Sequence, residues 1–231
     1  GNTNTANFVF KFCVDAGPDE TPPVIVTTDL LNGMPIAYNQ SSVDIKVYTN
    51  EPANCKWSHR DQAYDKMEET MTCSQSITEM NAQMLYRCST TLTGLKDQRE
   101  NNFYFRCQDQ PLKPENDRKT NTESYKFSVI GTRPLIITKA GPNDETIKDS
   151  TDSVPVTLEA DTFEGYKEGE ATCYYSDSGE DSDYVMFLYD NGDNTDHHHE
   201  QTLSFLEGSY EYYIKCGDLG GNYDVEKINF K

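Results

Sequence analysis

A pair of cysteine-bearing segments occurs twice in this chain, in the same order in each half. The upstream segments read ANCKWS at 53–58 and ATCYYS at 171–176, with an aromatic residue two positions after the cysteine. The downstream segments read FYFRCQD at 103–109 and YYIKCGD at 212–218, with a basic residue before the cysteine and Asp two positions after it. Because self-similarity on this scale marks repeated structural units, the chain is predicted to contain two modules of one kind.

Alternating large and polar residues around the cysteines indicate β-strands. Residues 210–216 place Tyr, Tyr, Ile and Cys on one face, and residues 103–107 and 43–47 alternate in the same way. A period of two is typical of a strand with one buried face. Turn signals recur at short intervals, and only residues 61–72 offer a candidate for a short helical turn. The sequence therefore predicts an all-β chain whose short strands pack as sandwiches.

The repeat also predicts how six of the seven cysteines pair. The upstream and downstream cysteines of each half are expected to join the two sheets of their sandwich, and a third bridge is expected to clamp residues 74–87, an insertion found only in the first half. The predicted disulfides are Cys55–Cys107, Cys73–Cys88 and Cys173–Cys216. Closing a loop of about 50 residues contributes roughly 4 kcal/mol in the chain-entropy model. Exchanged partners among the four cysteines of the first half, or buried free thiols, remain the alternatives.

The seventh cysteine, Cys13, follows an aromatic segment near the N-terminus. This segment reads NFVFKFCV, in which Phe8, Phe10 and Phe12 alternate before Cys13. An aromatic strand without a partner of its own is a site for pairing with another chain. We therefore expect residues 7–14 to join copies of the chain head to tail by donor-strand complementation. The alternatives are a unit cut from a longer array and a self-packed strand with an idle thiol.

The strongly acidic composition excludes several classes of partner. The formal net charge is −19, from 39 acidic and 20 basic residues. Nucleic acid and anionic membranes bind clustered basic residues, so neither is an expected partner. No run of about 18 apolar residues suggests a membrane span, and direct membrane insertion is not expected. Spaced cysteines without a C-x-x-C pair are typical of an oxidising compartment, and the polar start GNTNT without a signal sequence indicates a mature or excised extracellular product.

Few residues suggest chemistry. No nucleophile elbow, P-loop or dinucleotide fingerprint occurs, so no catalytic residue and no enzyme are predicted. His197 and His199 would share one face of a strand and could bind a metal with Glu200 or a nearby Asp. A solvated loop is the default interpretation of that run, and no metal site is predicted. The acidic loop 190–196 does not match the calcium-loop pattern, so calcium is left open as the one candidate cofactor.

Two further positions carry local expectations. Asn39, in the sequon Asn-Gln-Ser, is a candidate glycosylation acceptor in an exposed turn. Asp15, Asp109 and Asp218 each lie two residues after a cysteine, and their side chains are expected to bond turn amides.

The second half contains motifs of a known family. The segment LEGSY at 206–210, followed by the cysteine strand, resembles the L-x-G-x-Y tyrosine corner of immunoglobulin-like (Ig-like) and fibronectin-like sandwiches. The segment DLGGN at 218–222 resembles the D-x-x-G-N turn before the last strand of prokaryotic Ig-like modules. With EPANCKWS and GPDETPPVI, these motifs make the chain similar to tandem Ig-like modules of archaeal or uncultivated bacterial surface proteins. Trp57 departs from the antibody pattern, because it follows the upstream cysteine by only two residues.

The resemblance implies two tandem Ig-like β-sandwich domains preceded by an N-terminal extended strand. The expected boundaries are 1–20 for the extended segment, 21–131 for the first domain and 132–231 for the second. The expected function is a structural subunit of an extracellular surface filament or layer, with copies of itself as partners. The alternative is an adhesin or receptor segment that binds glycan or protein on a partner cell surface through exposed aromatic residues, for which Tyr174, Tyr213 and Trp57 are the candidates.

Overall fold

The computed structural model describes residues 11, 19–188 and 197–231. Within these residues the regular structure consists of β-strands and five short 3-10 helices, so the chain is all-β as predicted. The helices are η1 (Tyr64–Lys66), η2 (Ile77–Glu79), η3 (Glu115–Asp117), η4 (Tyr166–Gly169) and η5 (Asp181–Asp183). None of them is long and apolar enough to cross a membrane.

Nine strands before residue 132 form the first sandwich. They are β1 (Ile25–Thr28), β2 (Met34–Ile36), β3 (Ser42–Thr49), β4 (Ala53–Ser58), β5 (Glu69–Thr70), β6 (Thr72–Cys73), β7 (Tyr86–Thr93), β8 (Glu100–Asp109) and β9 (Tyr125–Gly131). One sheet has the order β1-β3-β7-β6 and the other the order β2-β9-β8-β4-β5, with β2 parallel to β9. Trp57 and three phenylalanines fill the space between the sheets, because the alternating residues of both inner faces point there.

Seven strands after residue 133 form the second sandwich. They are β10 (Leu135–Gly141), β11 (Val154–Glu164), β12 (Thr172–Ser176), β13 (Val185–Met186), β14 (His198–Phe205), β15 (Tyr210–Gly217) and β16 (Tyr223–Phe230). The sheets have the orders β10-β11-β14 and β13-β12-β15-β16. Leu158, Phe187, Ile214 and Ile228 are fully buried between them. Both modules therefore repeat one Ig-like strand order, in which the upstream cysteine strand pairs with the downstream one.

The three disulfides join the cysteine pairs that the sequence predicts, but they lie within sheets and not between them. Cys55 is directly opposite Cys107 on β4 and β8, and Cys173 is directly opposite Cys216 on β12 and β15. The expectation that these bridges join facing sheets is wrong. Adjacent strands lie about 4.8 Å apart and facing sheets about 10 Å apart, so only the cross-strand position suits a Cα–Cα distance of 4.1 Å.

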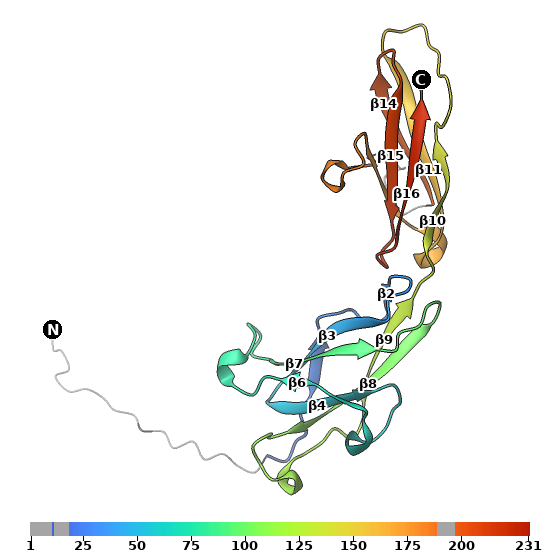
Figure 1. Ribbon diagram of the computed structural model, residues 1–231. Coiled ribbons are helices and arrows are strands. Elements are labelled where there is room, and N and C mark those ends of the chain that lie inside the picture. The colour runs from blue at the N-terminus through green and yellow to red at the C-terminus, as the bar shows by residue number, and fades with distance from the viewer. Residues whose placement is uncertain (1–10, 12–18, 189–196) are drawn as a thin grey trace, which may run out of the picture.

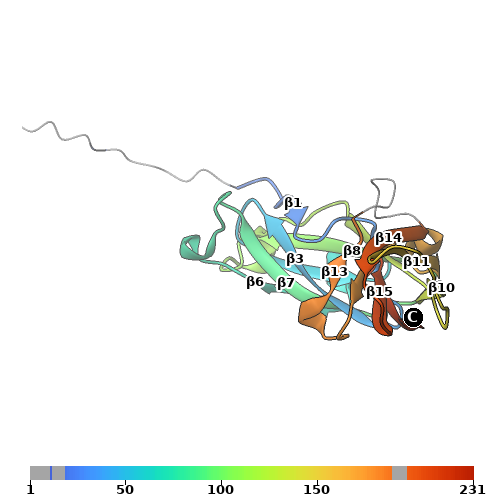
Figure 2. The same ribbon diagram turned by 90° about the horizontal axis from the view of Figure 1, so that it is seen from above.

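The modules are joined end to end where β9 runs into β10 (Figure 1). The C-terminus lies at the end of the second module that is remote from this joint. Seen from above, the first module extends to one side of the second, so the two are not collinear (Figure 2). The connection consists of only a few residues after Gly131, so the side chains around it determine the geometry of the joint.

Candidate functional site

Asn222 is the central residue of the joint between the modules. Its Oδ1 accepts a hydrogen bond from the Tyr38 backbone N–H at 2.7 Å, and its Nδ2 donates to Thr132 Oγ1 at 2.8 Å. Thr132 Oγ1 donates in turn to the Ile36 carbonyl at 2.7 Å. Asn222 is 8% exposed and Thr132 is 4% exposed. These buried bonds connect the turn before β16 directly to the first module.

Asp218 holds that turn in shape. Its Oδ1 accepts from the Asn222 N–H at 2.9 Å, and its Oδ2 accepts from the Tyr166 N–H at 2.7 Å. Gly165 lies beside this carboxylate with φ of 64°, and a Cβ there would come within 2.6 Å of Asp218 Oδ2. The expectation that Asp218 bonds turn amides is confirmed, and its position two residues after Cys216 was the signal for it; Asp15 lies outside the described residues. No sequence pattern indicated that Asn222 would contact the other module.

Asp109 has the same place in the first module, but within the described part of the chain its side-chain hydrogen bonds stay inside that module. It is fully buried, and its Oδ1 accepts from the Lys119 N–H at 2.6 Å, again a turn amide. Asp19, Glu51 and Asp109 bring carboxylate oxygens within 4.8 Å of one another at this end of the first module. Burial, followed by the nearby charges of Asp19 and Asp109, raises the pKa of Glu51 to about 6.

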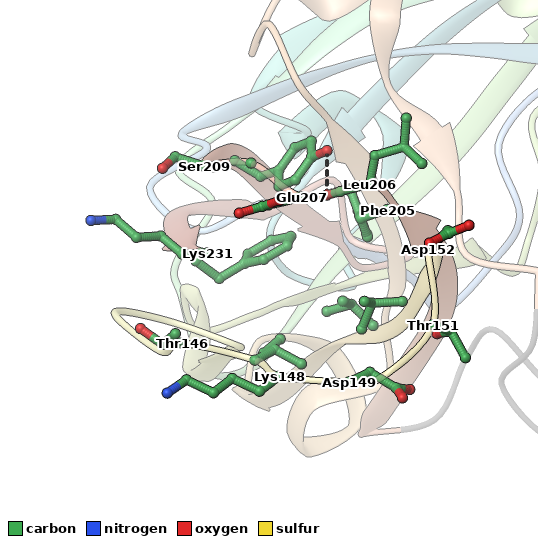
Figure 3. A pocket seen from close by; sticks show the side chains of 16 residues that line it. Thr146, Lys148, Asp149, Thr151, Asp152, Phe205, Leu206, Glu207, Ser209 and Lys231 are labelled. Atoms are coloured by element: carbon green, nitrogen blue, oxygen red, sulfur yellow. Dashed lines mark hydrogen bonds between the residues drawn. The ribbon is translucent and has the colours of Figure 1, made fainter.

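A pocket lies at the end of the second module that is remote from the joint (Figure 3). Its volume is about 920 Å³, and Phe205, Tyr210 and Phe230 form part of its lining. Tyr210 Oη donates to the Leu206 carbonyl at 2.9 Å, which is the bond expected of a tyrosine corner. Lys148 and Lys231 extend from one side of the pocket. Aromatic faces with charged groups around them suit a polar ligand with apolar faces, or another module.

The predicted joint between subunits falls on residues that the structure does not describe. Phe8, Phe10, Phe12 and Cys13 all lie outside the described residues. Asn39 is exposed, as the glycosylation prediction requires, and its backbone N–H donates to Asp97 Oδ1 at 2.9 Å. It lies next to Tyr38, so a glycan on Asn39 would be attached beside the joint between the modules.

The histidine run folds differently from the arrangement considered for a metal. His199 is fully buried, so it cannot share an exposed site with His197. His197 and His198 are both exposed, and His198 Nδ1 bonds Asp161 while its Nε2 lies 3.0 Å from Glu200 Oε1. The hydrogen bonds from Asp161 and Glu200 raise the pKa of His198 to about 9. His198 and His199 differ in exposure because side chains alternate along β14. His198 and Glu200 therefore lie on the outer face of the sheet, and His199 lies on the inner face.

Trp57 is not one of the exposed aromatic residues that the adhesin alternative needs. It is 1% exposed, and its Nε1 donates to Thr90 Oγ1 at 3.0 Å across the core of the first module. Tyr174 and Tyr213 are half-buried. Lys227 Nζ lies 5.7 Å from the centre of the Tyr213 ring, so part of that ring is covered.

No protein-family model matches the sequence, and no curated protein does. Among solved structures, the chain is similar to the fibronectin(III)-like modules of Clostridium thermocellum CbhA, with 8% identity, a TM-score of 0.46, and coverage of 90% of this chain and 92% of that one. It is also similar to Rst D1-D2, with 13% identity, a TM-score of 0.36, and coverage of 91% and 99%. Because these scores are below 0.5, the assignment of an Ig-like fold depends on the strand order of the chain itself.

Proposed function

We propose that this chain is a structural segment of an extracellular surface protein, in which two Ig-like modules form a stiff unit that assembles head to tail with copies of itself. The observation that carries the proposal is the joint at Asn222, where buried hydrogen bonds connect the two modules. If the linker were flexible, the Asn222 amide and its partners would be hydrogen-bonded to water and not to each other. Three disulfides fit a secreted or extracellular protein, and the proposal assigns the chain to a cell-surface filament or layer.

The internal joint suggests how one copy would meet the next. The end of the first module that receives the Asn222 turn corresponds to the end of the second module that contains the open pocket. In addition, β14 pairs with β11 on one side and with no other strand of the described residues. Both modules contain their own last strand, β9 and β16, so residues 7–14 would add to an existing sheet edge and not replace a missing strand.

Deletion of residues 1–16 tests the assembly. The full chain is expected to form elongated particles in sedimentation velocity and electron microscopy, and the deletion is expected to leave soluble monomers. Cys13→Ser in the full chain is the matched control, because it keeps the aromatic segment and removes the thiol. Assembly that survives the deletion would exclude the N-terminal segment as the connection, and a full chain that stays monomeric would exclude the polymer.

A second candidate function follows from the pocket in Figure 3, which an adhesin could use to bind a glycan. The observation that favours it is the aromatic lining formed by Phe205, Tyr210 and Phe230. A glycan array with the full chain is the measurement, and Tyr210→Ala should abolish any signal. Signals that are the same for the parent and the variant would place glycan binding elsewhere.

A further inference from the structure

We infer that the outer face of the second module contains a binding site for a divalent transition ion of the zinc class, with His198, Glu159 and Glu200 as ligands. One nitrogen of His198 and one carboxylate oxygen from each glutamate lie within 4.8 Å of one another. Zinc commonly takes imidazole and carboxylate ligands in a tetrahedral arrangement, in which neighbouring ligand atoms are roughly 3.3 Å apart. His198 Nε2 and Glu200 Oε1 are already 3.0 Å apart, so small side-chain movements would complete the site.

The strand register explains why these groups meet. Glu159 on β11 lies directly opposite Glu200 on β14, and Asp161 lies directly opposite His198. Like charges directly opposite each other destabilise a sheet, and Lys139 beside Glu159 and His198 beside Glu200 offset this repulsion when no metal ion is bound. All three ligands point outward, with side-chain exposures of 50% for His198, 53% for Glu200 and 29% for Glu159, and the site is therefore open to solvent.

Asp161 orients the imidazole for this role. It bonds His198 Nδ1, so Nε2 is the nitrogen that faces Glu200. A histidine that binds a metal through Nε2 usually donates a hydrogen bond from its Nδ1–H to a carboxylate. Asp161 is thus a positioning residue, and a fourth coordination place remains for water.

Lys139 occupies part of the same face and acts as a competitor. Its Nζ lies 2.6 Å from Glu159 Oε1. When the ion binds, His198 loses its Nε2 proton to solvent and Lys139 has to release Glu159 or share its carboxylate. Removal of the Lys139 ammonium should therefore strengthen binding, which a merely structural ion pair would not predict.

Isothermal titration of the full chain with zinc chloride at pH 8 tests the site, with Cys13→Ser in every sample so that this thiol cannot bind the ion. One zinc ion per chain is expected. His198→Gln or Glu200→Gln should weaken binding at least about tenfold, and Asp161→Asn about 10-fold or more. His59→Gln is the matched control, because among the described residues Glu68 is the one carboxylate bonded to His59, at 2.7 Å. That variant should bind as the parent does.

Two further readouts separate the site from non-specific binding. Lys139→Met should bind zinc more tightly than the parent, and Co²⁺ should give a visible absorption spectrum that His198→Gln removes. The inference is overturned if the parent binds no zinc, or if His198→Gln and Glu200→Gln both bind it as tightly as the parent. It does not depend on head-to-tail assembly, since a monomer contains all of the ligands.

Discussion

In the first module the cross-strand disulfide lies against a second disulfide, whereas in the second module it lies among apolar side chains. Cys88 Sγ is 3.4 Å from Cys55 Sγ, and both bridges share one small cluster of buried residues. Cys173 and Cys216 instead belong to the same core as Phe187 and Ile214. The same disulfide position is therefore packed against a second disulfide in the first module and against apolar side chains in the second.

The two modules also differ in the side-chain hydrogen bond that supports each sandwich. The first module has the Trp57 bond to Thr90 inside its core, and the second has the Tyr210 bond to the Leu206 carbonyl at one end. The difference teaches that the repeated cysteine strands define the sheet, while each module uses its own residues to connect the sheets and close the ends. The predictions below test how far this contrast determines stability.

The largest expected effect is the loss of the bridge that has no neighbour. Replacing Cys173 and Cys216 by Ser should destabilise the second module by about 4 kcal/mol in the chain-entropy model. The same change at Cys55 and Cys107 should weaken the first module, but the Cys73–Cys88 bridge remains to restrain it. Guanidinium unfolding separates the two, because Trp57 is the one tryptophan of the chain and its fluorescence reports only the first module.

The contrast would fail if both double variants shifted only the tryptophan transition, or if neither shifted any transition. Far-UV circular dichroism follows both modules and serves as the second probe. The second-module variant should show an early loss of dichroism at denaturant concentrations where the fluorescence is still native.

The next effect concerns the turns before the last strand, 110–121 in the first module and 218–222 in the second. Asn222→Ala removes bonds to Tyr38 and Thr132 and leaves buried polar groups unsatisfied, at a cost of about 2 kcal/mol. Small-angle scattering should show a wider range of particle lengths. Asn121→Ala is the control, because the described side-chain partners of Asn121 belong to the first module, such as the Cys107 N–H at 2.7 Å. An unchanged scattering profile for Asn222→Ala would mean that other contacts hold the joint.

A smaller effect is expected at the tyrosine corner. Tyr210→Phe removes the 2.9 Å bond to the Leu206 carbonyl and should destabilise the second module by about 1 kcal/mol. The tryptophan transition of the first module should not move. If that transition shifts by as much as the far-UV signal, the two modules unfold as one unit.

The smallest effect is a difference in pH dependence. The folded pKa of Glu51 is about 6, above its ordinary 4.5, so its contribution to the first module is present below pH 4.5 and is lost as the pH rises through 6. Partial exposure limits this change to about 1 kcal/mol. Glu211 in the second module has a lowered pKa because Lys227 bonds it, so its contribution is lost as the pH falls. Glu51→Gln should flatten the pH profile of the tryptophan transition, and an unchanged profile would contradict this account.

The repeated Cys segments and the period-two alternation were enough to predict an all-β tandem, the cysteine partners and the turn bonds of Asp109 and Asp218. These features are local or periodic, so the sequence carries them directly. The sequence could not determine whether the bridges lie within or between sheets, because that depends on which strands become neighbours. It also could not separate a buried Trp57 from an exposed one.

Only the tertiary structure brought together residues that are distant in the chain. Asn222 reaches Tyr38 because two modules meet at a short connection, and the Glu159, His198 and Glu200 cluster exists because β11 and β14 pair in one particular register. A shift of one residue in that register would move His198 to the opposite face of the sheet. The sequence by itself determined the two modules and the cysteine pairs of their disulfides. The tertiary structure decided the joint between the modules and the outer-face cluster, because these contacts depend on long-range packing and not on local pattern.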